Sequence, residues 1–156
     1  MKNKVRFSVI IPLYNKEVSI ASTIQSVLNQ TYDDFELIVV NDGSTDKSRE
    51  VIADIADSRI RIIDKENGGV SGARNRGIRE ANNEWITFLD GDDRWDANYL
   101  SLMNGLIEVY PDYKFFASSI SYVEADLGRK GKTYVIDDFF KLNHRSTFIH
   151  TDAIVI

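Results

Sequence analysis

The sequence predicts an α/β protein in which a mostly parallel, Rossmann-like sheet carries helices on both faces. Short apolar runs rich in β-branched residues alternate four times with segments of helical periodicity over roughly the first 110 of 156 residues. Some of these runs are almost entirely apolar, as is typical of strands covered on both faces. This alternation indicates βαβ units with right-handed crossovers, which build a parallel sheet.

The first two strands are expected at Phe7–Ile11 and Phe35–Val40, because both segments are short, apolar and rich in β-branched residues. A helix over Lys16–Gln30 joins them. Its apolar residues recur at helical spacing: Ile20, Ile24, Val27 and Leu28. The turn "NDGSTD" follows the second strand and offers Ser44 or Thr45 as the N-cap of a second helix. That helix carries Val51, Ile52, Ile55 and Ala56.

A third strand is expected at Arg59–Ile63, where apolar residues alternate with arginine. The glycine-rich segment "KENGGVSG" then leads into a helix from about Val70 to Ala81. The fourth strand is expected at Glu84–Leu89, and Asp96 can cap the helix after it. The apolar face of that helix contains Leu100, Met103, Leu106 and Ile107.

After Pro111 the alternation changes and indicates a partly antiparallel region. Strands are expected within 113–123, 132–136 and 146–156, with a short helix at 137–142. The last strand reaches Ile156 without a polar tail, so we expect a chain that is truncated at its C-terminus.

Composition excludes several classes of protein. The net charge of −5 argues against a nucleic-acid surface, which needs clustered lysine and arginine. The absence of cysteine removes disulfides, thiolate catalysis and cysteine-based zinc sites. No apolar run approaches the ~18 residues of a membrane span. We therefore expect a cytoplasmic protein, and attachment to the inner face of a membrane stays open.

Ligands of open α/β sheets bind beyond the carboxyl ends of the strands. Three loops at that edge carry polar side chains: Pro12–Asn15, Asn41–Gly43 and Asp90–Asp93. Close carboxylates repel one another unless one of them is protonated or a cation lies between them. Mg²⁺ or Mn²⁺ suits oxygen ligands and often holds phosphates at the same time, so the pattern favours a metal–diphosphate site.

Each motif also has a simpler interpretation. "DGDD" alone is typical of a solvated acidic loop, and "NDGS" alone is typical of a tight turn. Tyr14 can stack on a base or simply close the edge of the sheet. Arg74 opposes the helix macrodipole near the start of its helix, a position useful for meeting phosphates but also tolerated in solvent. His144 and His150 lack a third metal-ligating partner.

Four segments, "FSVIIPLYNKE", "FELIVVNDGSTDKS", "ENGGVSGARNRGI" and "WITFLDGDD", resemble the successive signature segments of family-two inverting glycosyltransferases. The resemblance covers about residues 6–110. It implies the GT-A fold of nucleotide-diphosphosugar transferases, with residues 1–110 binding the donor and residues 111–156 beginning the acceptor side within one structural domain. It also implies a UDP-linked sugar as donor, a glycan or lipid-linked acceptor and a role in polysaccharide biosynthesis at the cell envelope.

The resemblance further implies roles for single residues. Pro12, Tyr14 and Glu17 would lie around the nucleoside, and Asp42 would accept a hydrogen bond from the base. Arg74 would lie close to the base or the diphosphate. In the D-x-D motif, Asp90 would lie near the ribose and Asp92 would bind the Mn²⁺ or Mg²⁺ that bridges the two phosphates. Asp93 would lie behind these ligands or in solvent.

The catalytic base of the family is expected beyond Ile156, and no motif supports the carboxylates Asp126, Asp137, Asp138 and Asp152 in that role. A donor-nucleotide and metal-binding fragment without transferase activity is therefore the main alternative. A phosphoacceptor receiver domain would need paired carboxylates where Pro12 and Leu13 stand, and a nucleotidyltransferase would need a glycine-rich loop there. A homodimer formed through an exposed sheet edge stays open.

Overall fold

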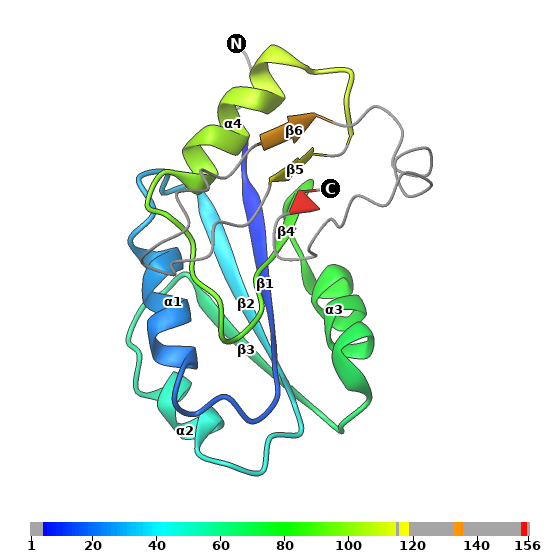
Figure 1. Ribbon diagram of the computed structural model, residues 1–156. Helices are drawn as coiled ribbons and strands as arrows, with labels where there is room; N and C mark the ends of the chain where they lie inside the picture. Colours follow the sequence, from blue (N-terminus) through cyan, green and yellow to red (C-terminus); the bar gives the residue numbers. More distant parts are fainter. Residues whose placement is uncertain (1–4, 115, 119–132, 136–153, 156) are drawn as a thin grey trace, which may run out of the picture.

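A computed structural model of the chain describes residues 5–114, 116–118, 133–135 and 154–155. One seven-stranded sheet has the strand order β3-β2-β1-β4-β7-β5-β6 (Figure 1). The strands are β1 (Phe7–Leu13), β2 (Phe35–Asp42), β3 (Ile60–Lys65), β4 (Trp85–Phe88), β5 (Phe116–Ser118), β6 (Thr133–Val135) and β7 (Ile154–Val155). The helices are α1 (Ile20–Leu28), α2 (Ser48–Ala53), α3 (Gly69–Glu80) and α4 (Tyr99–Val109).

Strand pairing follows the predicted alternation. β1 lies between β2 and β4 and pairs with both in parallel, and β2 pairs in parallel with β3. β7 is antiparallel to β4, and β5 is antiparallel to both β6 and β7. The predicted α/β class, with a parallel sheet that ends in a partly antiparallel region, is therefore confirmed.

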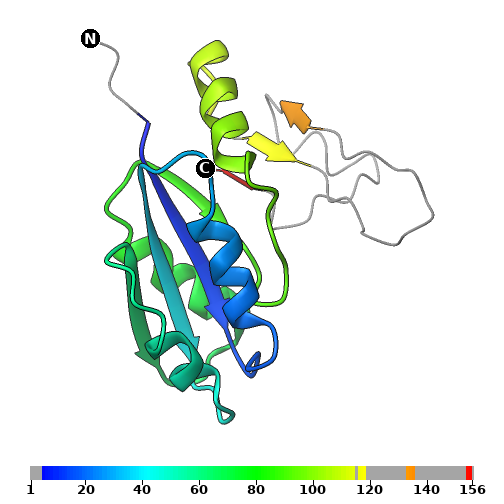
Figure 2. The same ribbon diagram turned by 90° about the vertical axis from the view of Figure 1, so that its left-hand side faces the viewer.

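Helices cover both faces of the sheet, as predicted. Figures 1 and 2 show α3 on one face, with α1 and α2 on the other. The buried cluster beneath α3 consists of Ile10, Ile38, Val40, Ala73 and Phe88. The larger cluster on the opposite face takes Phe7, Val9 and Ile11 from β1 together with residues of α1, α2 and α4. Because successive side chains of a strand point to opposite faces, both faces of β1 and β2 must be apolar.

α3 lies very close to β1 because it has a glycine at the contact. A Cβ atom at Gly77 would lie 2.4 Å from Ile10 Cγ2 and 3.2 Å from Ile10 Cδ1. Ile10 is fully buried. The absence of a side chain at Gly77 therefore sets the distance between helix and sheet, and this places the N-terminus of α3 beside the carboxyl ends of the strands.

Several predicted boundaries are wrong, and contacts between loops explain two of them. α1 begins at Ile20 rather than Lys16, because the backbone N–H groups of Lys16 and Glu17 donate to the side chains of Ser48, the first residue of α2, and of Asp46 in the β2–α2 loop. Ser44 and Thr45 do not cap α2, which begins at Ser48 with Lys47 at the N-cap position. Both instead contact Asn15.

The remaining differences are smaller. α4 begins at Tyr99 after Asn98, and Asp96 contributes only its main-chain carbonyl, which accepts from Tyr99 N. β1 and β2 each continue two residues beyond the predicted ends, to Leu13 and Asp42. The predicted helix at 137–142 lies outside the described residues.

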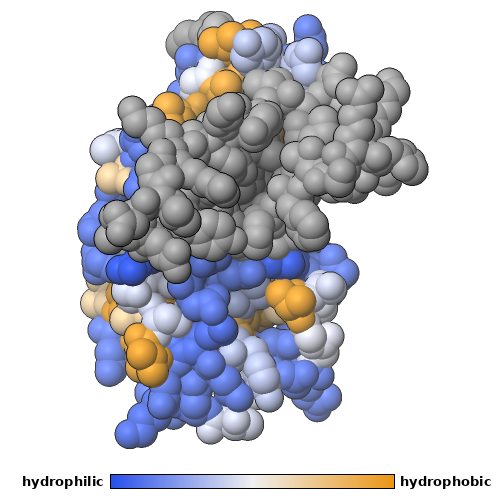
Figure 3. Space-filling model, in the orientation of Figure 1, coloured by the Kyte–Doolittle hydropathy of each residue, from blue (hydrophilic) through white to orange (hydrophobic). Residues whose placement is uncertain are grey.

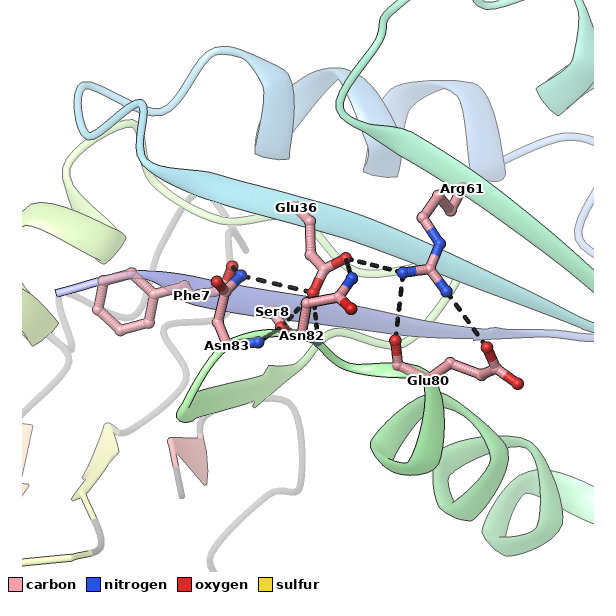
Figure 4. Close-up of polar contacts among 7 residues, drawn as sticks. All are labelled: Phe7, Ser8, Glu36, Arg61, Glu80, Asn82 and Asn83. Carbon is pink, nitrogen blue, oxygen red and sulfur yellow. Dashed lines mark hydrogen bonds and ion pairs between the residues drawn. The ribbon is translucent and has the colours of Figure 1, made fainter.

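The amino-terminal edge of the parallel strands carries a polar network around Glu36 (Figure 4). Glu36 Oε1 accepts from Ser8 Oγ and from Asn82 N, both at 2.7 Å, and from Asn83 Nδ2 at 3.4 Å. Glu36 Oε2 accepts from Asn82 Nδ2 at 2.8 Å and Arg61 Nη1 at 3.1 Å. Burial raises the pKa of Glu36, but these hydrogen bonds and the Arg61 charge outweigh it and lower the pKa overall. The network fastens the α3–β4 connection to β1 and β2.

Candidate functional site

A pocket of about 480 Å³ lies at the carboxyl-terminal edge of the parallel strands, beside the N-terminus of α3. Its wall is formed by Pro12, Leu13, Tyr14, Lys16, Asp42, Asn67, Gly69, Val70, Ala73, Asp90, Gly91 and Asp92. The lower part of the face seen in Figure 3 is mainly hydrophilic, with a few separate apolar groups. The pocket brings together the last residues of β1 and β2, the loops that follow β1, β3 and β4, and the start of α3, as the topology of an open parallel sheet requires.

The loop after β1 is held rigidly by the loop after β2. Asn15 has a left-handed backbone, with φ of 52°. Its N–H donates to Ser44 Oγ at 3.1 Å, and its Oδ1 accepts from Thr45 N at 2.8 Å. Lys16 N donates to Ser48 Oγ at 2.8 Å. These bonds fix the backbone at Asn15 and Lys16, directly after Tyr14, and the side chains of Tyr14 and Lys16 lie on the pocket wall. The Tyr14 side chain remains about half exposed, which leaves its ring available for stacking.

Glu17 takes part in the same connection between loops. Its Oε2 accepts from Lys47 N at 2.8 Å, and its own N–H donates to Asp46 Oδ2 at 3.0 Å. The carboxylate thus lies at the N-terminus of α2, where it binds an N–H that has no partner within the helix. Glu17 is not among the residues that line the pocket.

Asp42 ends β2 as a buried carboxylate, with 2% of the residue exposed. Its Oδ1 accepts from Lys65 Nζ and, at 3.0 Å, from Gly68 N. Burial raises the pKa of Asp42, but the bonds from Lys65 and from the backbone of Gly68 and Gly69 outweigh it and lower the pKa overall. Asn67 Nδ2 donates to the main-chain carbonyl of Asp42 at 3.0 Å. Asp42 is therefore an ionised hydrogen-bond acceptor on the pocket wall.

Arg74 and Asp90 form an ion pair between α3 and the loop after β4. Arg74 Nη2 lies 2.6 Å from Asp90 Oδ1, and the guanidinium lies 6.0 Å from the centroid of the Phe88 ring. Asp90 lines the pocket, whereas Arg74 is not among the lining residues. Arg74 thus orients Asp90, because a charge-assisted hydrogen bond restricts the carboxylate to one geometry.

The loop that carries Asp92 is anchored on α1. The Gly91 carbonyl accepts from Ser19 Oγ at 2.9 Å and from Thr23 Oγ1 at 3.1 Å. Asp92 lines the pocket and pairs with Lys16 through its Oδ2. Asp93 does not line the pocket and is exposed, and its N–H donates to the Asp90 carbonyl at 3.0 Å. The three carboxylates on the pocket wall, Asp42, Asp90 and Asp92, each have a cationic partner.

Comparison with known proteins identifies the family of this chain. The model of the family described as "Glycosyl transferase family 2" matches residues 8–154. The chain belongs to glycosyl transferase family 2. The pocket described above therefore lies in a family 2 protein, and the match extends the resemblance of the four sequence segments over nearly the whole chain.

Two curated relatives illustrate the similarity. The uncharacterized glycosyltransferase EpsJ of Bacillus subtilis is 51% identical over 88 residues, which cover 55% of this chain and 26% of EpsJ. The UDP-Glc:alpha-D-GlcNAc-diphosphoundecaprenol beta-1,3-glucosyltransferase WfgD of Escherichia coli is 40% identical over 114 residues, 69% of this chain and 45% of WfgD. The chain spans less than half the length of the curated relatives it matches.

Solved structures share the fold of this family 2 chain. TarS of S. aureus in complex with UDP-GlcNAc superposes with a TM-score of 0.69 at 25% identity, covering 81% of this chain and 37% of TarS. The mannosyltransferase PcManGT from Pyrobaculum calidifontis, in complex with GDP-Man and Mn²⁺, superposes with a TM-score of 0.63 at 23% identity. This superposition covers 80% of this chain and 38% of PcManGT. At 23% identity, the similarity establishes a shared fold alone. Within the described part of this chain, no helix is both long enough and apolar enough to cross a membrane.

The carboxylate oxygens at the pocket fit a divalent cation that is bound jointly by the protein and by substrate phosphates. No group of three or more histidine or acidic residues that could enclose a metal ion exists among the described residues. Mg²⁺ is commonly bound through one or two carboxylates together with substrate phosphates, rather than in an all-protein cage. Asp92 and Asp90, two residues apart in the chain and both on the pocket wall, offer that incomplete set. The residues present therefore fit a metal that arrives with a diphosphate.

Sequence reasoning missed the residues contributed by the loop after β3. Lys65 ends β3, and Asn67, Gly69 and Val70 follow it, so the same topological rule that selected the other three loops could have selected this one. Lys16 was also missed, because a lone lysine after a strand is usually solvated. The carboxylates Asp126, Asp137, Asp138 and Asp152 and the two histidines lie outside the described residues.

Proposed function

We propose that this chain is the donor-binding part of an inverting glycosyltransferase. It holds a UDP-linked sugar in the pocket and transfers the sugar to a hydroxyl of a glycan or lipid-linked acceptor. Residues 1–110 supply the donor site and residues 111–156 begin the acceptor side. The observation that carries the proposal is the convergence of Tyr14, Asp42, Asp90 and Asp92 on one pocket wall.

The arrangement of side chains gives each a defined task. Tyr14 stacks on the base, and Asp42 accepts a hydrogen bond from it, because an ionised carboxylate can only accept. Pro12 lines the same wall and Glu17 holds the loop that carries Tyr14. Arg74 keeps Asp90 directed at the ribose.

Asp92 would hold Mn²⁺ or Mg²⁺ against the two phosphates, and the bound cation would supply Lewis-acid stabilisation of the nucleoside diphosphate leaving group. The acceptor hydroxyl attacks the anomeric carbon from the face opposite the diphosphate, which inverts the configuration. A carboxylate outside the described residues takes the proton of that hydroxyl. The cytoplasmic face of the membrane fits this function because WfgD, by its name, uses a diphosphoundecaprenol-linked acceptor.

The test is a calorimetric titration of UDP into the chain with and without Mn²⁺, on the wild type, Asp92→Asn and Asp93→Asn. Mn²⁺ should strengthen UDP binding in the wild type, and Asp92→Asn should weaken Mn²⁺-dependent binding by at least about tenfold. Asp93→Asn is the matched control, because this neighbouring carboxylate does not line the pocket. No UDP binding by the wild type, or equal binding by the wild type and Asp92→Asn, would contradict the proposal.

A second candidate is a nucleotide-binding fragment that transfers nothing, since the chain spans less than half of its relatives. Measuring UDP release from a UDP-sugar, with and without an acceptor glycan, separates the two. Acceptor-dependent release supports the transferase, and tight UDP binding without any release supports the fragment.

A further inference from the structure

Lys65 makes a contact that none of the roles above explains. It is the last residue of β3 and lies directly opposite Asp42, the last residue of β2, in the parallel register. Lys65 Nζ donates to Asp42 Oδ1 and to the carbonyl of Glu66. The two side chains are 21% and 3% exposed, so the pair is largely withdrawn from water. Lys65 is not among the residues that line the pocket.

The position of the ammonium group is tightly restricted. A Cβ at Gly68 would lie 3.0 Å from Lys65 Nζ, and a Cβ at Gly72 would lie 3.9 Å from it. Lys65 Nζ thus lies against the first turn of α3, where the helix macrodipole opposes a cation. Asp42 compensates for this placement, because it receives both the ammonium and the Gly68 N–H on the same oxygen. The lysine and the aspartate therefore form one unit.

We propose that Lys65 is a positioning residue that sets nucleobase specificity through Asp42. By holding Oδ1 in a fixed ion pair, it orients the Asp42 carboxylate as an acceptor for a ring N–H of the base. Uracil carries a hydrogen on N3, whereas cytosine carries a lone pair there. An ionised carboxylate accepts from the first and repels the second. This inference rests on the proposed function, because it requires that a nucleotide occupies the pocket.

Removal of Lys65 should change the chemistry of Asp42 as well as its geometry. The ammonium is the largest of the influences that offset the effect of burial on the pKa of Asp42, and the remaining ones are backbone N–H groups of α3. The other charged side chains on the pocket wall, Lys16, Asp90 and Asp92, are already engaged in the ion pairs described above. Without the ammonium, Asp42 loses the ion pair that fixes its orientation, so it discriminates less sharply between a donor and an acceptor at N3 of the base. The base preference should therefore fall together with the affinity.

The experiment measures dissociation constants of UDP and CDP by calorimetry at constant Mn²⁺ and constant pH. The wild type should prefer UDP over CDP by at least about tenfold, the effect of one charge-assisted hydrogen bond. Lys65→Met should weaken UDP binding by about tenfold and reduce the UDP preference to about threefold or less. Lys114→Met, which removes an exposed lysine outside the pocket, is the control and should leave both constants unchanged.

A double-mutant cycle with Asp42→Asn tests whether Lys65 acts through Asp42. If it does, Lys65→Met should change UDP affinity less than about twofold in the Asp42→Asn background. Equal weakening of UDP and CDP by Lys65→Met, or additive effects in the cycle, would overturn the inference, since either result indicates direct contact with the phosphates or a general loss of structure.

A thermal unfolding curve accompanies each variant. If Lys65→Met does not fold, Lys65→Gln carries the test, because its amide can donate to Asp42 without a positive charge. It should lower the UDP preference, and an unchanged preference would contradict the role of the charge. If the wild type itself fails to bind UDP, the proposed function fails, which is a different outcome.

Discussion

Glu36 and Asp42 stand at the two ends of the same strand, and their surroundings differ in an instructive way. Both are carboxylates withdrawn from water, and the pKa of each is lowered by hydrogen bonds and a cation that outweigh burial. Glu36 accepts hydrogen bonds on both oxygens, from β1, β3 and the α3–β4 connection (Figure 4). Asp42 receives Lys65 and Gly68 on Oδ1 and lies on the wall of a pocket.

The comparison separates a carboxylate that stabilises the fold from one that is available to a ligand. A buried charge is tolerated when hydrogen bonds compensate it, and full compensation leaves nothing for a substrate. At the amino edge the partners come from the chain alone. At the carboxyl edge Asp42 lies on the wall of a pocket, and under the proposed function a base supplies a further hydrogen bond there.

The largest expected effect is the loss of folding stability in Glu36→Gln, at about 3 kcal/mol, because Arg61 and the asparagine donors lose a charged acceptor. UDP affinity, measured below the unfolding transition, should stay within about twofold of wild type. Asp42→Asn should show the reverse pattern, with the greater loss in UDP binding. Urea unfolding and calorimetry on the same preparations measure both quantities.

Glu84, an exposed residue that follows Asn83 in the chain, supplies the control for Glu36→Gln. Glu84→Gln should change the free energy of unfolding by no more than about 0.5 kcal/mol. A Glu36→Gln protein as stable as the wild type would show that the network of Figure 4 adds nothing to the fold.

A smaller effect is expected in the pH dependence of stability. The folded-state pKa of Glu36 lies below its ordinary value of 4.5. Its contribution to the stability of the fold is therefore fully present above pH 4.5 and is lost as the pH falls through the folded-state pKa. Each unit of depression corresponds to about 1.4 kcal/mol. The wild type should therefore lose more stability than Glu36→Gln between pH 5 and pH 3, in urea titrations at each pH. Parallel pH profiles for the two proteins would exclude this linkage.

The smallest effect concerns the turn that follows Asp42. Gly43 has φ of 70°, and a Cβ there would lie 3.0 Å from Asn67 N. Gly43→Ala should cost about 1–2 kcal/mol of stability and weaken UDP binding, because Asn67 also binds the Asp42 carbonyl.

Gly105→Ala in α4 is the matched substitution for this turn. A Cβ at Gly105 meets nothing within 4 Å, so alanine there should stabilise the protein by about 0.5–1 kcal/mol. If both alanine variants shift the unfolding midpoint in the same direction, the backbone argument at Gly43 is wrong.

The sequence by itself determined the fold class and the edge at which the site lies. Alternating apolar runs and helical periodicity depend on local burial, so β1, β2, β3 and α3 were placed within a few residues of their actual bounds. The predicted starts of α1 and α2 were wrong because the side chains of Asn15, Ser44 and Ser48 bind backbone N–H groups of another loop rather than cap a helix.

Only the tertiary structure decided which polar residues share the pocket and which support it. Glu17 and Asp42 are both acidic residues close to strand ends, yet one binds the start of α2 and the other lines the pocket. Lys65 became relevant only when the parallel register set it opposite Asp42. Such partnerships join residues from separate strands and loops, and the free energy of a buried charge depends on these distant partners, which periodicity along the chain does not encode.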